Sequence, residues 1–318
     1  MRRKAGKILV FSLKLGIAVF SLVYIWFNLS KYGSHQIKLN IGNTYEGLLV
    51  LSVCFLMLLN WTIESVKWRF LLLKLEKIKL LQSLKAVFTG IAFAIFTPNR
   101  IGELAGRIFV LHQDHRVKGI FSTGVGSLAQ MTVTVVCGLI GGILILIFHP
   151  SKLSFIHADH VLWIAILSGL AALLFPLMFF NLKTVFRLFQ KFKLPAKAMN
   201  TIHVISEYSA RELLLVLLLS LSRYFVFVLQ FCLLLVFFNA GIHWYDAVLA
   251  ISLTYFVSSI VPSFTLAEIG IRGSAAIFFM GLFVTNDIAV ISATVLLWII
   301  NLAIPSVFGA ILFFRTKV

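Results

Sequence analysis

The fold depends on one stretch, "FTPNRIGELAGRIFVL" at residues 96–111, which interrupts a long apolar segment with a proline, two glycines and three charged side chains. The charged residues are Arg100, Glu103 and Arg107. A charge near the centre of a lipid bilayer costs about 2.5 to 3.5 kcal/mol on insertion scales, so ionisable residues at that depth are candidates for a functional site. The architecture follows from how the chain accommodates this interruption.

The composition indicates an integral membrane protein. Of 318 residues, 60% are hydrophobic and only 12% are charged. Many apolar runs approach the ~20 residues that a bilayer-spanning helix needs. The formal net charge is +17, but the basic residues lie in short segments between the apolar runs. In that position they set orientation and contact anionic lipids, so we expect no nucleic-acid partner.

Six full spans are predicted, at residues 8–27, 47–66, 120–148, 161–181, 212–238 and 288–314. Two further apolar regions, residues 80–111 and 246–283, are each interrupted by a polar cluster that contains a proline. Each region is either one broken span or a re-entrant hairpin that returns to the same side of the membrane. The two alternatives place the loop after each region on opposite sides of the membrane.

The distribution of basic residues favours hairpins. With hairpins, the cytoplasmic segments hold 4, 6, 2, 6 and 2 Lys or Arg residues and the other side holds three; these segments are residues 1–7, 67–85, 112–118, 183–211 and 315–318. If both regions crossed, the count would be 13 inside and 10 outside. The positive-inside rule therefore predicts two hairpins and places both termini in the cytoplasm. Length agrees, because the 15 residues at 83–97 form roughly 22 Å of helix against a hydrocarbon core of ~30 Å.

The element order then repeats. Residues 1–149 give three spans and a cytoplasmic-side hairpin at about 80–112, and residues 150–318 give three spans and an outer-side hairpin at about 246–284. The sequence thus predicts an all-α polytopic membrane protein, six full spans plus two oppositely inserted re-entrant helical hairpins, arranged as an inverted repeat that is common in transporters. Proline and glycine favour chain reversal, so the expected hairpin tips are Pro98, Asn99, Gly102, Pro262 and Gly270.

Both hairpins carry the pattern E-x-x-x-R, as Glu103 with Arg107 and Glu268 with Arg272. A spacing of four places the side chains on one helical face, so each hairpin is expected to hold an ion pair. One interpretation is that each pair only neutralises itself and fixes its hairpin. Arg100 adds a positive charge with no evident local partner. Such an excess cation in a cavity would receive a phosphate or another anionic head group, which favours a binding role.

Other polar residues lie within the predicted spans. Arg223 either lines the same cavity or extends toward the interface, and the sequence does not separate these placements. Asn60, Glu64 and Lys67 share a helical face, where structural pairing is favoured. The predicted substrate-binding residues are Arg100, Glu103, Arg107, Arg223, Glu268 and Arg272.

Catalytic and metal-binding patterns are weak. Histidine-containing loops at residues 112–115 and 157–160 are predicted on opposite sides of the membrane, so they cannot form one metal site. The sequence contains no Walker A motif and no GxSxG motif. We therefore expect no metal, no cofactor and no enzymatic activity.

At its hairpins the sequence resembles the flippase-like membrane domain of lysylphosphatidylglycerol synthases, a family that also occurs as stand-alone membrane proteins. The likeness rests on P-x-x-x-G-E at residues 98–103, on the stretch at residues 262–270, and on "KWRFLL" after the second span. In the aminoacyl-lipid members a cytoplasmic transferase attaches an amino acid to phosphatidylglycerol, and the membrane domain moves the product to the outer leaflet. We expect no transferase in this chain.

The resemblance implies a flippase-like transporter in a bacterial cytoplasmic membrane, with membrane lipids as its partners. Its cargo would be an anionic or zwitterionic lipid, such as aminoacyl-phosphatidylglycerol or a related phospholipid. Three alternatives stay open: translocation of a polyprenyl phosphate or glycolipid, a small-solute permease, and a scaffold for a separate lipid-modifying enzyme. Either hairpin carboxylate would also offer a route to proton coupling.

Overall fold

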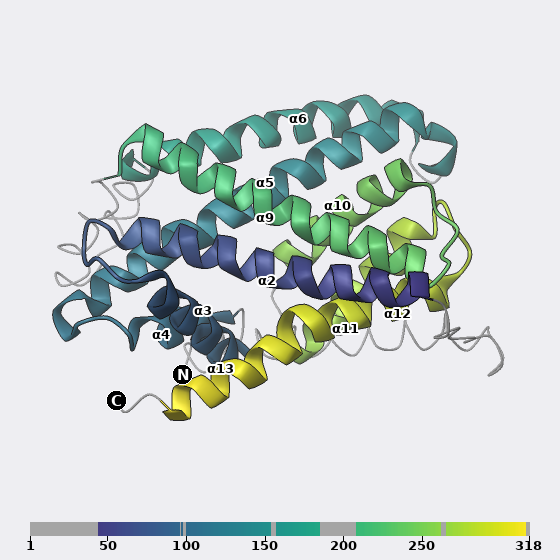
Figure 1. Cartoon of the computed structure of the whole chain (residues 1–318). Coiled ribbons are helices and arrows are strands. Elements are labelled where there is room, and N and C mark those ends of the chain that lie inside the picture. The colour runs from purple at the N-terminus through teal and green to yellow at the C-terminus, as the bar shows by residue number, and fades with distance from the viewer. Residues whose placement is uncertain are drawn as a thin grey trace, which may run out of the picture.

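The computed structural model describes residues 44–95, 97, 100–153, 157–184, 208–261 and 265–315. Within these ranges the chain is helical and contains no strand (Figure 1). The predicted first span at residues 8–27 lies outside the described residues, as do three predicted hairpin-tip residues, Pro98, Asn99 and Pro262.

Five helical segments are long and apolar enough to cross a membrane, which makes the protein a multi-pass membrane protein. They coincide with five of the six predicted spans. They are α2 (Thr44–Leu72), α5 (Arg116–Phe148), α6 (Ala158–Phe180), α9 (Ala210–Phe237), and a final segment that comprises α12 (Asp287–Trp298), η4 (Ile299–Ala303) and α13 (Ile304–Arg315).

Each of the two interrupted regions folds as a pair of shorter helices. The first contains α3 (Leu80–Ile95) and α4 (Gly102–Ile108), and the second contains α10 (Trp244–Ile260) and α11 (Thr265–Met280). The 16 residues of α3 and the 17 of α10 rise about 24 and 26 Å, less than the ~30 Å hydrocarbon core. Within each region the two helices pack against each other.

The ends of each interrupted region lie close together. The Glu76 carboxylate, before α3, accepts a hydrogen bond from the backbone N–H of His112, after α4 (3.2 Å). At the second region, His149 Nε2 lies 3.0 Å from Asp246 Oδ1, and the His149 ring packs on Phe283 with a centroid distance of 5.1 Å. The two ends of each interrupted region therefore lie close to each other.

Close approach of α3 and α4 depends on glycine. A Cβ added at Gly106 would lie 2.6 Å from the Cα of Gly90, and one at Gly102 would lie 2.2 Å from the Phe93 carbonyl oxygen. Real Cβ atoms do not come this close, so the two backbones meet only because these positions carry no side chain. This contact fixes α4, and with it Glu103 and Arg107.

The second predicted glycine tip is wrong. Gly270 is buried inside α11, whereas α10 ends at Ile260 and α11 starts at Thr265. The break between the two helices therefore falls before Gly270. A glycine within a membrane helix is tolerated where packing is close, which is its position here.

The final span contains a π-helical turn, η4, that the apolar pattern of residues 288–314 did not predict. Pro305 follows this turn at the second position of α13. Because proline has no backbone N–H and clashes with the preceding turn, it displaces the regular hydrogen-bond pattern, and single π turns accommodate such a disturbance. The turn carries the buried Asn301.

The largest core lies where α2, α9, α10 and α12 meet, and its fully buried members include Val53, Phe231, Ile251 and Leu297. By contrast, the most apolar part of α6 has no buried residue and packs along one side of α5 (Figure 1). Apolar side chains exposed on a membrane helix are compatible with lipid contact.

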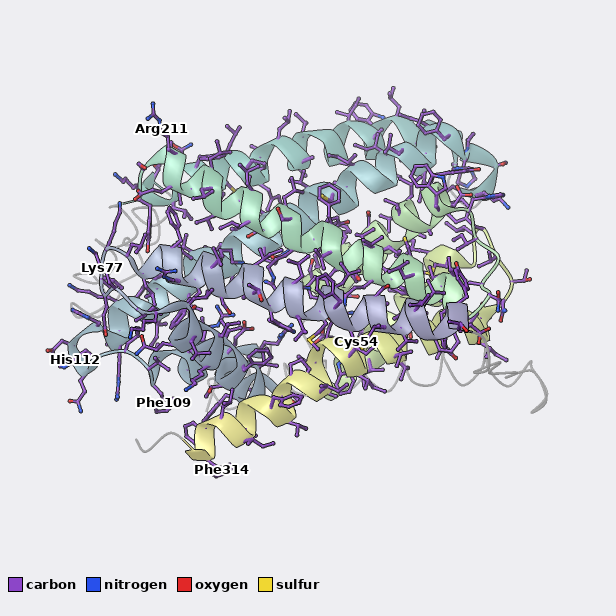
Figure 2. The ribbon with its side chains drawn as sticks, viewed as in Figure 1. Cys54, Lys77, Phe109, His112, Arg211 and Phe314 are labelled. Carbon is purple, nitrogen blue, oxygen red and sulfur yellow. The ribbon has the colours of Figure 1, made fainter. Side chains whose placement is uncertain are left out.

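Polar side chains gather at the ends of the helices. Figure 2 places Lys77, His112 and Arg211 at one end of the molecule. An ion pair between Lys74 Nζ and Glu212 Oε2 (2.8 Å) joins the end of α2 to the start of α9 there.

Candidate functional site

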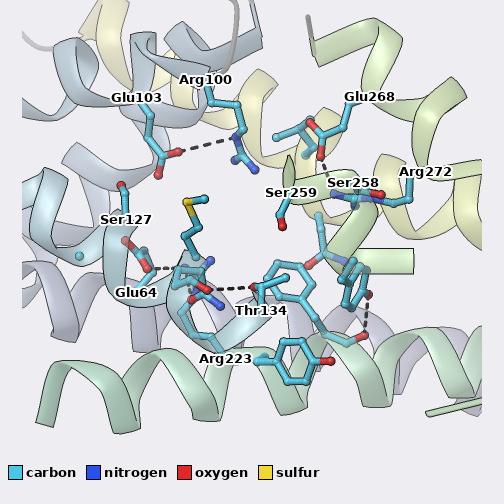
Figure 3. Close-up of a pocket in the computed structure, with 18 of the residues that line it drawn as sticks. Glu64, Arg100, Glu103, Ser127, Thr134, Arg223, Ser258, Ser259, Glu268 and Arg272 are labelled. Atoms are coloured by element: carbon cyan, nitrogen blue, oxygen red, sulfur yellow. Dashed lines mark hydrogen bonds and ion pairs between the residues drawn. The ribbon is translucent and has the colours of Figure 1, made fainter. Parts of the chain in front are cut away.

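A polar cavity of about 550 Å³ lies among the helices (Figure 3). Its size falls within the ~300 to 1,000 Å³ of typical small-molecule sites. Side chains from both interrupted regions and from α2, α5, α9 and the final span line it. The charged lining residues are Glu64, Lys67, Arg100, Glu103, Arg223, Glu268 and Arg272.

Glu64 on α2 is the centre of the charged network. Its side chain is 6% exposed and contacts three cations. Lys67 Nζ lies 2.7 Å from Oε2, Arg107 Nη1 donates to Oε1 at 2.8 Å, and Arg223 pairs with Oε2. A buried carboxylate needs such partners, because an unpaired charge out of water is costly. Glu64 therefore joins α4 to α9 through its two oxygens.

Arg223 points into the cavity from the middle of α9. Its Nε donates to Asn60 Oδ1 at 2.7 Å and its Nη1 to Gln130 Oε1 at 3.3 Å. The guanidinium carbon lies 5.2 Å from the centre of the Trp61 ring, within cation–π range. Of the two placements that the sequence left open, the structure has the cavity placement, and Arg223 does not extend toward the interface.

The predicted ion pair of Glu103 and Arg107 forms on α4. Arg107 also binds Glu64 and is 2% exposed, so it lies behind the cavity wall. Arg100 was expected to have no local partner, and this expectation is wrong, because its Nε lies 3.7 Å from Glu103 Oε2. Glu103 follows Arg100 by three residues, about one helical turn, and this spacing accounts for the contact.

Arg100 also has an unusual backbone conformation, with φ at 58°. Non-glycine residues seldom occupy this left-handed region, and strained residues of this kind occur at functional sites. Glycine would fit this backbone with less strain. The chain nevertheless has a long charged side chain here, and that side chain lines the cavity.

The second predicted ion pair, between Glu268 and Arg272, forms on α11. The Arg272 guanidinium carbon lies 5.6 Å from the centre of the Tyr255 ring of α10. Figure 3 shows this pair on one side of the cavity and Arg100 with Glu103 on the other. Ser258 and Ser259 of α10 also line the cavity, and Figure 3 draws Ser259 between the two pairs.

The cavity lining also contains buried polar atoms without a hydrogen-bond partner. Four are N–H donors and one is an acceptor; the donors are Trp61 Nε1, Arg100 Nε, Arg272 Nε and Trp298 Nε1, and the acceptor is Asn301 Oδ1. Buried polar groups are usually satisfied, so this set needs an explanation. Because these atoms are fully buried, a ligand rich in oxygen acceptors would reach them only after the lining side chains move.

Five of the six predicted binding residues line this cavity, and the sixth, Arg107, supports it from behind. Glu64 and Lys67 were interpreted as structural, yet both line the cavity. Three polar residues of α5 were missed: Ser127, Gln130 and Thr134. Their spacing of three and four places them on one helical face inside an apolar span, a signal that the sequence did contain.

Among the described residues, no group of three or more His, Cys, Asp or Glu side chains is arranged to hold a metal ion. His115 of the first histidine-containing loop contacts Glu76 instead, with Nδ1 at 3.3 Å from Oε2. This loop connects the end of α4 to α5.

The sequence matches a model of a known protein family. Residues 12–309 match the family model described as "Lysylphosphatidylglycerol synthase TM region". A search of curated proteins finds no match. The family match covers almost the whole chain, and it agrees with the predicted resemblance at the hairpins and at "KWRFLL". The protein belongs to the lysylphosphatidylglycerol synthase transmembrane-region family, whose membrane domain is linked to lipid handling.

Proposed function

We propose that the protein is a flippase-like transporter that moves an anionic or zwitterionic lipid across the bacterial cytoplasmic membrane. The observation that supports this proposal best is the polar cavity, whose charged residues come from both interrupted regions and from two membrane-spanning helices, α2 and α9. The lipid head group would pass through this cavity while the acyl chains stay in the hydrocarbon phase. The lipid leaves chemically unchanged.

The interrupted regions act as two re-entrant hairpins inserted from opposite sides. Their short helices and the meeting of their ends at Glu76 and at His149 support this arrangement. Glu76 lies at the same end as the basic segments before α3 and after α4. By the positive-inside rule this end faces the cytoplasm, and His149 faces the outside. The inverted repeat of residues 1–149 and 150–318 remains a prediction of the same proposal.

The charged network would lower the barrier for a phosphate in the membrane. A phosphate loses its hydration when it enters hydrocarbon, and guanidinium groups replace that hydration with strong, charge-assisted hydrogen bonds. Arg100 and Arg223 line the cavity and belong to the group of cations around Glu64 and Glu103. They are the proposed phosphate ligands.

Exchange of ion-pair partners would let the cavity open to alternate sides. Arg107 already contacts two carboxylates, Glu64 and Glu103, from different helices. A bound phosphate competes with these carboxylates for the arginines, so binding can loosen α4 from α2. Such a change of partners between packed elements is a common switching device.

Reconstitution into lipid vesicles tests the proposal. A tail-labelled phospholipid is quenched from outside by an impermeant reductant, and the rate of signal loss measures movement between leaflets. We expect movement with the wild type and a large loss with Arg223→Gln. Arg211→Gln is the matched control, since it removes an exposed arginine at the start of the same helix (Figure 2). Equal rates in protein-free vesicles and with folded wild type would refute the transporter.

A further inference from the structure

The charges of the cavity network are not balanced, and the imbalance is local. The Glu268–Arg272 pair on α11 is neutral. Around Glu64 and Glu103, two carboxylates face four cations: Lys67, Arg100, Arg107 and Arg223. The network thus carries a formal excess of two positive charges, all of it on the side of α2, α4 and α9.

We propose that this excess selects the cargo by net charge, so that the cavity accepts a phosphate-bearing head group with net negative charge and rejects one with net positive charge. The inference rests on the proposed lipid transport and narrows its cargo. Phosphatidylglycerol, which carries one negative charge, meets this requirement. Lysyl-phosphatidylglycerol, whose two ammonium groups outweigh its one phosphate, does not.

Electrostatics in a confined site supports this selection. Like charges repel more strongly where water is excluded, because the effective dielectric is lower than in bulk water. Clefts lined by one sign of charge concentrate ligands of the opposite sign. The two excess positive charges near Glu64 therefore favour binding of an anionic ligand and oppose binding of a cationic one.

The hydrogen-bonding capacity points to the same cargo. A phosphate diester offers acceptors only, and three arginines with guanidinium donors line the cavity: Arg100, Arg223 and Arg272. An ammonium group offers donors only, and Asn301 Oδ1 is the one unused buried acceptor among the described lining atoms. Like the cationic network, the lining is therefore complementary to phosphate.

The central carboxylate, Glu64, does not provide an alternative ammonium site. Glu64 contacts three cations, Glu103 contacts two, and Glu268 contacts Arg272. An ammonium at Glu64 would have to displace Lys67, Arg107 or Arg223, which would leave that buried cation without its carboxylate. Breaking a buried pair in this way is strongly unfavourable.

Arg100 is the first contact for the head group. Its side chain is 35% exposed, more than that of Arg223 at 8%, and its Nε has no hydrogen bond. Its one carboxylate contact is long, at 3.7 Å. Arg100 can therefore turn to a phosphate without breaking a close ion pair.

The test compares head groups on one labelled tail in the same proteoliposomes: phosphatidylglycerol, phosphatidylethanolamine and lysyl-phosphatidylglycerol. We expect phosphatidylglycerol to move roughly tenfold faster than the lysyl lipid, a difference of about 1.4 kcal/mol, with the ethanolamine lipid between them. Equal or faster movement of the lysyl lipid would overturn the charge selection and leave the transporter intact.

Two further arms separate the remaining outcomes. Binding of each lipid to the detergent-solubilised protein, followed by thermal shift, measures selectivity without transport. If no lipid moves but phosphatidylglycerol still binds more tightly than the lysyl lipid, the transport proposal fails and the charge selection stands. Uptake of soluble glycerol phosphate, without lipid movement, would assign the same phosphate chemistry to a small-solute permease.

Charge variants should change the ratio of the transport rates of the two lipids, which misfolding alone does not change. Glu64→Gln raises the formal excess to three positive charges and should widen the preference for phosphatidylglycerol over the lysyl lipid. Arg100→Gln lowers the excess to one and should narrow that preference roughly threefold. General damage would slow both lipids alike. An unchanged ratio in both variants would overturn the inference.

Discussion

Arg223 of α9 pairs with Glu64 of α2 although the two residues are 159 positions apart in the chain. The pair joins the two predicted halves of the protein. Because Glu64 also binds Arg107 of α4, the first interrupted region is connected to α9 through a single carboxylate. Three helices that hold the cavity therefore share one buried charge.

Removal of the Glu64 carboxylate should destabilise the protein. Glu64→Ala leaves Lys67, Arg107 and Arg223 without their common partner, and loss of one member of a buried ion pair costs about 3 to 5 kcal/mol. Thermal unfolding in detergent measures the effect. Glu76→Gln, which removes a half-exposed carboxylate at the helix ends, should change the midpoint little. Equal midpoints for wild type and Glu64→Ala would contradict the central role of Glu64.

Gly106→Ala should push α4 away from α3. The added Cβ would lie 2.6 Å from Gly90 Cα and 2.8 Å from the Thr89 carbonyl oxygen, both backbone atoms that cannot rotate away. We expect a loss of about 1 to 3 kcal/mol in stability and slower lipid movement, because Arg107 shifts with the helix. Gly169→Ala on α6 has open space around its Cβ and should be harmless. A fully active, stable Gly106→Ala would show that the close contact is not required.

Arg100→Gly should separate backbone strain from side-chain function. Glycine accepts the left-handed backbone, so folding should be unchanged or improved by about 1 kcal/mol, while lipid movement falls because the guanidinium is lost. Asn239→Gly is the control, since Asn239 has a similar φ of 52° at the end of α9. It should leave lipid movement unchanged. Full transport by Arg100→Gly would remove Arg100 from the phosphate site.

The orientation can be tested with single cysteines at Lys77, Lys152 and Arg211, after the three native cysteines are replaced. If both interrupted regions are hairpins, the site at residue 152 should react with an impermeant thiol reagent outside the cell, and the site at residue 211 only from within. If both regions cross the membrane, these two results are exchanged. Residue 77 is cytoplasmic in either topology and serves as the internal control.

Apolar runs and charge distribution were sufficient to predict the five described spans and both interrupted regions, because membrane insertion is dominated by local hydrophobicity. The i,i+4 pairs on α4 and α11 were also predictable from spacing alone. Both properties are local in sequence.

The central position of Glu64 was not predictable in this way. Its partner Arg223 is far away in the chain, and helical spacing gives no information on which faces of α2 and α9 meet. Likewise, the sequence showed that Gly270 is near a reversal but not that α11 begins before it. Tertiary packing determines both the Glu64–Arg223 contact and the start of α11. The spacing of residues in a single sequence does not reveal such packing.

Blocking the cavity tests the central claim most directly. Ser259 of α10 lies in the cavity lining (Figure 3), so Ser259→Cys in a protein without native cysteines can be modified with a charged, bulky thiol reagent. Modification should stop lipid movement, and reduction of the mixed disulfide should restore it. Lys152→Cys, modified to the same extent outside the cavity, should keep its full rate. Undiminished lipid movement after complete modification at residue 259 would show that the head group does not pass through this cavity.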